Sequence, residues 1–298
     1  MPTHTAPAAI FLQDASSGKL FQKSFDRTAF LFSHTLHQSP YFSYPAILDL
    51  AKRLSVRTNR FYVEEGETTP GRGWTVRISN QSLLENLEGI AGSHTLVMLK
   101  RVHEEPEYKQ ILGACLDELS DISKINMRRS YRDPLMTILV TSPFRVTPYH
   151  IDSEANLLMQ MHGSKSVYIF DGNDRQVLTT PELEKFWSGD ITAAKYKAPL
   201  QNRAWEFALE PGIGVSNPVT FPHWVKNGAE VSISLSINFK RVSNNAADVY
   251  RVNQQLRRLG LRPEDPGKMH LIDNTKGAIY RTFRNMKHTF DSWRARAH

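Results

Sequence analysis

At 298 residues, with 40% hydrophobic and 22% charged side chains, the chain is long enough to bury one substantial core. Its single cysteine, Cys115, excludes an intramolecular disulfide framework and suits a reducing compartment. The formal net charge of +7 lies entirely in residues 241–298, which hold 12 Lys/Arg against 5 Asp/Glu, so the rest of the chain is neutral.

No part of the sequence has the pattern of a secretory signal. None approaches the roughly 20 consecutive apolar residues that a membrane-spanning helix needs. We therefore expect a cytoplasmic protein.

Residues 1–130 are predicted to form a mixed α/β part that flanks a core. The sequence predicts helices over 42–54, 81–87 and 106–119. An aliphatic run predicts a strand over 95–102.

Residues 131–242 are predicted to form the core itself. Short apolar runs separated by Gly and Pro turns predict strands over 136–141, 146–150, 157–161, 165–170 and 231–239. The last run alternates apolar and small polar residues, which is typical of a half-buried strand. Such closely spaced strands favour an antiparallel barrel or jelly roll. The polar stretch 173–203 is either an insertion that shapes a substrate mouth or, more simply, a surface excursion.

Two histidines and a carboxylate mark a candidate metal site. His150 and Asp152 stand two residues apart, so in a strand their side chains point to the same face. His223 follows Pro222 at the entrance to a later apolar strand. Two His and one carboxylate leave three metal positions open, as in non-haem iron(II) oxygenases, whereas a structural zinc site takes four ligands and usually Cys. A lone H-x-D is more often a surface or capping pair, and it is the surrounding strands that favour a metal here.

Further residues accompany this triad at consistent spacing: Thr147, Pro148, Asn156, Gly163, Lys165, Glu210, Pro211, Gly212, Pro222 and Asn238. Over about residues 136–240, the set resembles the JmjC/cupin-like branch of the 2-oxoglutarate oxygenases. Residues 21–54 resemble the N-terminal part of that family more loosely. The resemblance implies a double-stranded β-helix (jelly roll) core, so the expected fold class is mainly β with α additions.

The resemblance also implies roles for individual residues. His150, Asp152 and His223 would bind Fe(II), and 2-oxoglutarate and O2 would be the cosubstrates. Lys165 would supply the cation for the far carboxylate of 2-oxoglutarate, with Thr147 beside it and Arg145 the next candidate cation. Asn156 and Asn238 would reach the cosubstrate or the iron. A tyrosine that often joins this carboxylate has no evident counterpart.

The expected function is hydroxylation of an unactivated C–H bond, with release of succinate and CO2. Because residues 1–240 are neutral, we expect a small-molecule substrate such as an amino acid, a sugar or a lipid-linked metabolite. A protein or tRNA hydroxylase is the alternative that the basic end of the chain supports. A non-catalytic cupin-like metal-binding or sensor protein is a second alternative, although it would have no need of Lys165.

Residues 243–298 are predicted to form a basic helical hairpin. Val249, Val252, Leu256 and Leu259 have helical spacing, and the Pro- and Gly-containing segment 260–267 ends that helix. A second helix, capped by Asn274 or Thr275, would carry a stripe of Ile279, Phe283, Met286, Phe290 and Trp293. This stripe fits packing on the chain's own barrel, a homodimer interface, or a surface for nucleic acid or anionic membrane. We expect the dimer ahead of the membrane.

Overall fold

The computed structural model describes residues 9–11, 15–72, 79 and 81–296. The chain divides into two compact units, and they are described separately. The barrel unit comprises residues 1–172 and 196–242, and the helical unit comprises residues 173–195 and 243–298. None of the helices in the described ranges combines the length and hydropathy needed to traverse a bilayer.

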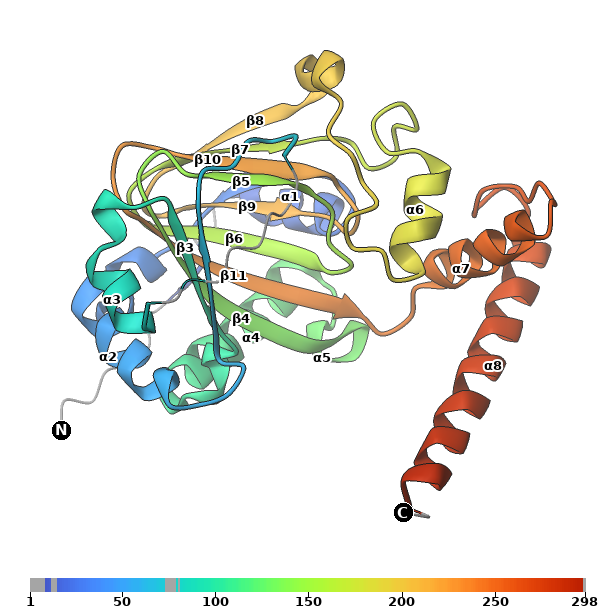
Figure 1. Ribbon diagram of the computed structural model, residues 1–298, viewed down its shortest axis with the longest axis horizontal. Helices are drawn as coiled ribbons and strands as arrows, with labels where there is room; N and C mark the ends of the chain where they lie inside the picture. Colours follow the sequence, from blue (N-terminus) through green and yellow to red (C-terminus); the bar gives the residue numbers. More distant parts are fainter. Residues whose placement is uncertain (1–8, 12–14, 73–78, 80, 297–298) are drawn as a thin grey trace. The chain divides into compact units, whose positions relative to one another are not determined.

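A seven-stranded antiparallel sheet forms one layer of the barrel unit (Figure 1). Its order is β1-β9-β6-β11-β4-β3-β2. The strands are β1 (Phe30–Ser33), β2 (Phe61–Glu65), β3 (Thr95–Lys100), β4 (Tyr131–Thr141), β6 (Ala155–His162), β9 (Ile213–Asn217) and β11 (Ser232–Arg241).

A four-stranded antiparallel sheet forms the facing layer, in the order β5-β10-β7-β8. Its strands are β5 (Val146–His150), β7 (Lys165–Ile169), β8 (Trp205–Leu209) and β10 (His223–Asn227). Two facing antiparallel sheets built from successive short strands confirm the expected jelly-roll core.

Three helices of the barrel unit, α2, α3 and α5, begin at side-chain caps. Ser43 accepts a hydrogen bond from the Ala46 amide at the start of α2, and Ser82 and Glu85 form a capping box at the start of α3. The helices are α1 (Ala15–Ser24), α2 (Tyr44–Ser55), α3 (Leu83–Glu88), α4 (Pro106–Ser123) and α5 (Met127–Ser130). Short 3-10 turns lie at Leu36–Gln38, Pro40–Phe42, Ile90–Gly92, Val102–Glu104 and Ala198–Arg203.

The helical unit consists of α6 (Thr180–Trp187), α7 (Asn245–Arg258) and α8 (His270–Arg296). Glu184 of α6 pairs with Arg257 of α7, and Asp248 of α7 pairs with Arg281 of α8. The guanidinium of Arg251 lies over the ring of Trp187 and also over that of Tyr280. The stretch between the barrel strands therefore belongs with the C-terminal helices.

The second C-terminal helix begins earlier than its expected caps, at His270. Asp273 in its first turn accepts a hydrogen bond from the Gly267 amide at 2.7 Å, so an acidic side chain supports the helix start in place of Asn274 or Thr275. Ile279, Phe283 and Met286 of the predicted stripe are exposed. The side chains of Phe290 and Trp293 lie outside the described residues.

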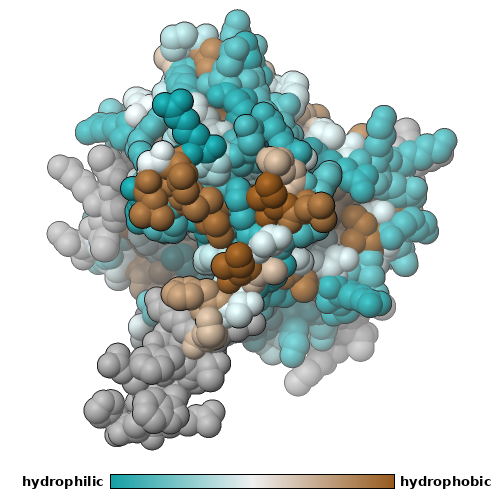
Figure 2. Space-filling model, turned by 90° about the vertical axis from the view of Figure 1, so that its right-hand side faces the viewer, coloured by the Kyte–Doolittle hydropathy of each residue, from teal (hydrophilic) through white to brown (hydrophobic). Residues whose placement is uncertain are grey.

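Exposed apolar side chains gather on the helical unit: Leu259, Leu261, Met269, Leu271, Ile272, Ile279, Phe283 and Met286. Figure 2 views the side of the molecule that carries α7 and α8, and shows hydrophobic groups set among hydrophilic neighbours.

Candidate metal centre

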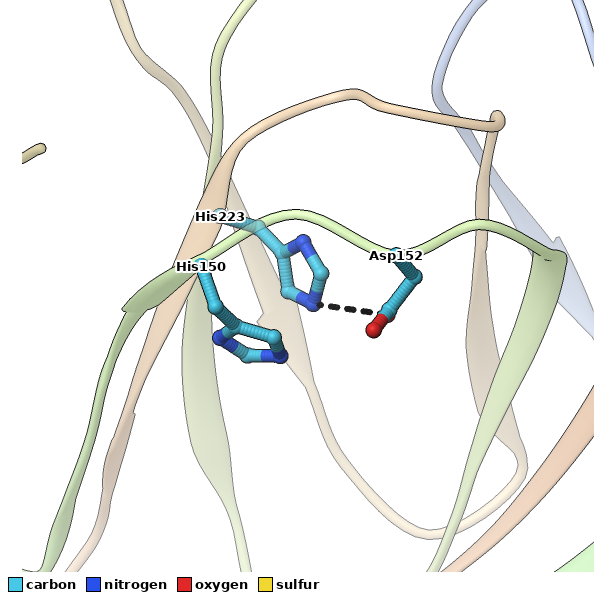
Figure 3. Close-up of side chains that lie close together, drawn as sticks. All are labelled: His150, Asp152 and His223. Atoms are coloured by element: carbon cyan, nitrogen blue, oxygen red, sulfur yellow. Dashed lines mark ion pairs between the residues drawn. The ribbon is translucent and has the colours of Figure 1, made fainter. Parts of the chain in front are cut away.

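The three predicted ligands come together at one end of the four-stranded sheet. His150 is the last residue of β5 and His223 the first of β10, and they are paired across the two strands. Asp152 lies in the connection just after β5, beyond the strand in which the sequence placed it. Figure 3 shows the three side chains facing one another.

The geometry of the triad suits a single ion. The two imidazole centroids are 4.1 Å apart, and Nε2 of His223 lies 3.6 Å from Oδ2 of Asp152. One ligand atom from each residue falls within 4.8 Å of the others. These atoms can therefore occupy one face of an octahedron around a metal.

Backbone carbonyls orient both histidines. Nδ1 of His150 lies 2.7 Å from the Pro148 carbonyl, and Nδ1 of His223 lies 3.0 Å from the Phe221 carbonyl. A carbonyl only accepts, so a proton on each Nδ1 would satisfy it and leave the Nε2 lone pair for a metal. Nδ1 of His223 also lies 3.0 Å from Nδ2 of Asn217, so this tautomer requires the Asn217 amide to turn its oxygen toward the ring. Burial, and then the neighbouring His150, lower the pKa of His223 to about 4, which keeps that ring neutral at physiological pH.

A cavity of about 190 Å³ extends from the triad between the two sheets. Its lining residues recur every second position along the strands because alternate side chains point inward. They are Leu96, Met98, Thr137, Leu139, Thr141, Thr147, His150, Asp152, Asn156, Leu158, Lys165, Val167, Val215, Asn217, His223, Val225, Ser236 and Asn238.

Lys165 places an ammonium group in this cavity. Its side chain is 6% exposed, and within the described ranges it makes no hydrogen bond or ion pair. Burial lowers the pKa of Lys165 to about 7. Burying a charged ammonium without a counter-charge costs free energy, and an anionic ligand would supply that counter-charge. The cavity therefore suits an anion.

Thr147, Asn156 and Asn238 line the same cavity, and their roles stay predictions. Thr147 lines the cavity from β5. Nδ2 of Asn156 donates to Oγ of Ser236 at 2.7 Å and contacts Oδ1 of Asn238, and the Ser236 hydroxyl donates to that same Oδ1 at 3.0 Å. The oxygen of Asn238 is therefore occupied, and its amide NH2 is the part left for a ligand.

Sequence reasoning missed Thr137, Thr141 and Asn217, which line the same cavity. Among the described residues no tyrosine does so. The Thr141 hydroxyl is engaged by the Ser232 carbonyl and the Asn227 amide. Thr137 and Thr141 stand four residues apart in an aliphatic run, and this even spacing was the available signal, because it places two polar groups on one face of a buried strand.

Arg145 does not serve as a second cation for the cavity. Its Nη2 donates to Glu64 Oε1 at 2.7 Å, and its Nη1 donates to the carbonyls of Gly66 and His94. The Arg145–Glu64 pair is buried, and neither residue lines the cavity. The guanidinium thus ties the β2–β3 region to the start of β5.

Comparison with known proteins supports the fold. No protein-family model matches the sequence, and none of the curated proteins matches it. Among solved structures, the X-ray structure of Escherichia coli ycfD has a TM-score of 0.54 at 14% identity, over 91% of this chain and 68% of that one. A structure of YcfD described as a ribosomal oxygenase from Escherichia coli has a TM-score of 0.50 at 16% identity, over 88% of this chain and 60% of that one.

The chain thus spans about two thirds or less of the length of these structures. Its fold is that of the JmjC/cupin-like oxygenases, so the resemblance seen in the sequence is confirmed for the fold and for the His-Asp-His triad. At this level of identity the likeness defines the fold, and the activity is argued from the site.

The comparison corrects the expected substrate. The structures that share the fold over about nine tenths of this chain are described as ribosomal oxygenases, which points away from a small molecule. The expectation of a small-molecule substrate is therefore wrong. It rested on the neutral net charge of residues 1–240, and a net charge does not report how the charged groups are arranged around a site.

Proposed function

We propose that this protein is an Fe(II)- and 2-oxoglutarate-dependent oxygenase that hydroxylates a side chain of a protein substrate. The observation that carries the proposal is the presence, within one cavity, of three potential metal ligands and the Lys165 ammonium, which has no ion-pair partner among the residues that the structure describes. A protein that only binds a metal has no use for that second feature.

Separate residues would bind the metal and the 2-oxoglutarate carboxylate. His150, Asp152 and His223 would hold the metal through two imidazole Nε2 atoms and a carboxylate, leaving one side of the ion open. Lys165, with the Thr147 hydroxyl, would neutralise the distal carboxylate of 2-oxoglutarate. When bound, iron and 2-oxoglutarate supply the oxidising chemistry, with succinate and CO2 as products.

The aliphatic lining would keep water away from the reacting groups: it includes Leu96, Leu139, Leu158, Val167, Val215 and Val225.

A groove beside the cavity supports a protein substrate. It has a volume of about 600 Å³ and shares Asn238 with the inner cavity. Its other lining residues are Asn59, Lys100, Arg101, His103, Asp133, Pro134, Leu135, Glu154 and Lys240. Charges of both signs suit a polypeptide segment, and Asn238, which lines both spaces, would lie where that segment meets the cavity.

The proposal is tested by incubating the protein with Fe(II), ascorbate, 2-oxoglutarate and isolated ribosomal proteins. We expect succinate from 2-oxoglutarate and a mass increase of one oxygen atom on a protein substrate. Asp152→Ala should yield neither product. Succinate that forms equally with Asp152→Ala would overturn the enzymatic proposal, and succinate without any modified protein would overturn the substrate class.

A further inference from the structure

The turn that leads into His223 is held in a strained conformation by its surroundings. Thr220 has a φ of +61°, in the left-handed region that a β-branched residue avoids. Its amide donates to the Asp152 carbonyl at 2.9 Å, which joins the backbones that carry two of the three ligands. On the other side of the turn, the Phe170 amide donates to the Pro222 carbonyl at 2.8 Å. Such a conformation persists only where several contacts define it.

A residue from the N-terminal part of the chain supplies one more of these contacts. Oδ1 of Asp26 accepts a hydrogen bond from the Val219 amide at 3.2 Å, across 193 residues of sequence. Asp26 is buried and lies just after α1. It therefore anchors the residue next to Thr220.

The second oxygen of Asp26 makes different contacts. Oδ2 accepts from the Tyr131 hydroxyl at 2.9 Å and from Nε of Arg241 at 2.5 Å, while Arg241 Nη2 donates to the Asp26 carbonyl at 3.0 Å. Tyr131 and Arg241 are paired at the ends of β4 and β11. One oxygen of the carboxylate thus contacts the end of the seven-stranded sheet, and the other contacts the turn before His223.

We propose that Asp26 is a positioning residue for the metal centre, acting through Val219 and the neighbouring Thr220–Asp152 hydrogen bond. The inference rests on the metal site of the proposed function. Its physical basis is that Val219 and Thr220 are consecutive, so fixing the Val219 amide limits where the Thr220 amide, and with it the Asp152 backbone, can lie. Supporting contacts of this kind govern how tightly a metal is held.

The alternative is that Asp26 only stabilises the fold as the partner of Arg241 and Tyr131. Asp26→Asn separates the two roles. An amide has one acceptor oxygen, while the carboxylate faces donors at both of its oxygens. The hydrogen bond from the charged Arg241 guanidinium is stronger than the one from the Val219 amide. We therefore expect the Asn oxygen to face Arg241 and the Asn NH2 to face the Val219 amide. The bond to Val219 is then lost while the side-chain shape is kept.

The experiment measures Co(II) affinity by calorimetry on the full chain, for wild type, Asp26→Asn and the matched control Tyr131→Phe. Tyr131→Phe removes one donor from Oδ2 and leaves the bond between Val219 and Oδ1 intact. We expect Asp26→Asn to weaken Co(II) binding by about 10–100-fold, the range typical of residues that support a metal ligand, and Tyr131→Phe to change it less than threefold. Equal affinities for all three proteins, or losses that follow the melting temperatures, would show a purely structural role.

Two further outcomes remain decisive. If wild-type protein and His150→Ala bind Co(II) alike, the proposed metal site fails, whatever Asp26 does. If Asp26→Asn does not fold, hydrogen exchange of the wild-type protein replaces it. The proposal then expects the Val219 and Thr220 amides to slow together when Co(II) binds, and a Val219 amide that exchanges freely with and without Co(II) would overturn it.

Discussion

The two imidazoles of the site are placed by strand pairing, and a backbone carbonyl lies beside Nδ1 of each. His150 and His223 are direct partners across β5 and β10, so neither ligand depends on a long flexible connection. Asp152 is less constrained by the sheet, since it follows the strand, and its backbone is held instead by the Thr220 amide. The carboxylate is therefore the ligand whose removal disturbs the fold least.

The first prediction concerns that carboxylate. Asp152→Ala removes one of three ligands, so we expect Co(II) affinity to fall at least 100-fold. The melting temperature of the metal-free protein should stay within about 2 °C, because the Asp152 side chain is 32% exposed. Calorimetry and circular dichroism check the two parts. Wild-type Co(II) binding in Asp152→Ala would contradict the assignment of the ligand.

The second prediction concerns Lys165. Lys165→Met keeps most of the volume and removes the charge that would face the 2-oxoglutarate carboxylate. A desolvated charge pair is worth about 2–5 kcal/mol, so the dissociation constant for 2-oxoglutarate should rise at least tenfold. Co(II) affinity should hardly change, because Lys165 is not a ligand. An unaltered 2-oxoglutarate affinity would mean that another residue binds the carboxylate. Arg145, the next candidate in the sequence, is already paired with Glu64.

The third prediction is a dependence of stability on pH. In the ligand-free protein the pKa of Lys165 is lowered from 10.5 to about 7 by burial. Between these values the unfolded chain binds the proton and the folded chain does not, so stability rises with pH from about 7 toward 10.5. Below pH 7 the full cost of the buried charge is present. Lys165→Met should therefore be more stable than wild type at pH 7, with the difference in urea unfolding disappearing by about pH 10.5.

At the scale of single elements, the alternating pattern of β11 predicted a strand but not the surroundings of its polar face. Its alternation of apolar and small polar residues predicts a strand with one face in solvent. The strand is instead central in its sheet, and Ser232 and Ser234 are fully buried. Ser236 and Asn238 line the cavity. The polar face of β11 points into the space between the two sheets, because the four-stranded sheet covers it.

The fourth prediction compares the faces of two helices. Phe283 of α8 is 65% exposed, whereas Val249 of α7 is fully buried. Phe283→Glu should leave the melting temperature within about 1 °C, while Val249→Glu should lower stability by several kcal/mol because it buries a charge. Thermal unfolding checks both. The same Phe283→Glu protein, examined by light scattering, tests the homodimer interface, one of the three alternatives for this stripe. A large drop in melting temperature for Phe283→Glu would show that this face is covered.

At the scale of the whole molecule, the helical unit is built from two separated segments. Residues 173–195 leave the barrel unit between β7 and β8 and group with residues 243–298. Their contacts include the Glu184–Arg257 ion pair and the Arg251 guanidinium over Trp187. This grouping gives the polar insertion a structural role that its composition alone did not indicate. The sequence-based division into 1–130, 131–242 and 243–298 stays a prediction about which parts fold independently.

The fifth prediction is that ligands stabilise the barrel unit by mass action. Co(II) and 2-oxoglutarate together, each at 100 times its dissociation constant, should each add about 2.7 kcal/mol. For a unit of this size each kcal/mol corresponds to roughly 2–4 °C in melting temperature. EDTA should reverse the metal contribution. A melting temperature that does not respond to Co(II), in a protein that does respond to EDTA, would indicate a different resident metal.

The sequence alone determined the local features of this protein. Short apolar runs and their turns predicted β3, β4, β5, β6, β7 and β11, but not β1, β2, β8, β9 or β10. Ser43 and Pro106 lie where helices begin. The spacing of His150, Asp152 and His223 marked the candidate metal ligands. These signals are local because backbone alternation and capping act over a few residues.

Only the tertiary structure decided which distant groups share a cavity or a turn. Asn217 and Asp26 gave no signal of their own, since their importance comes from contacts made across the sheets and across long stretches of chain. The kind of substrate likewise depends on how charges are arranged around an opening. The net charge of the chain cannot predict that arrangement, because it is a sum over residues that folding places far apart.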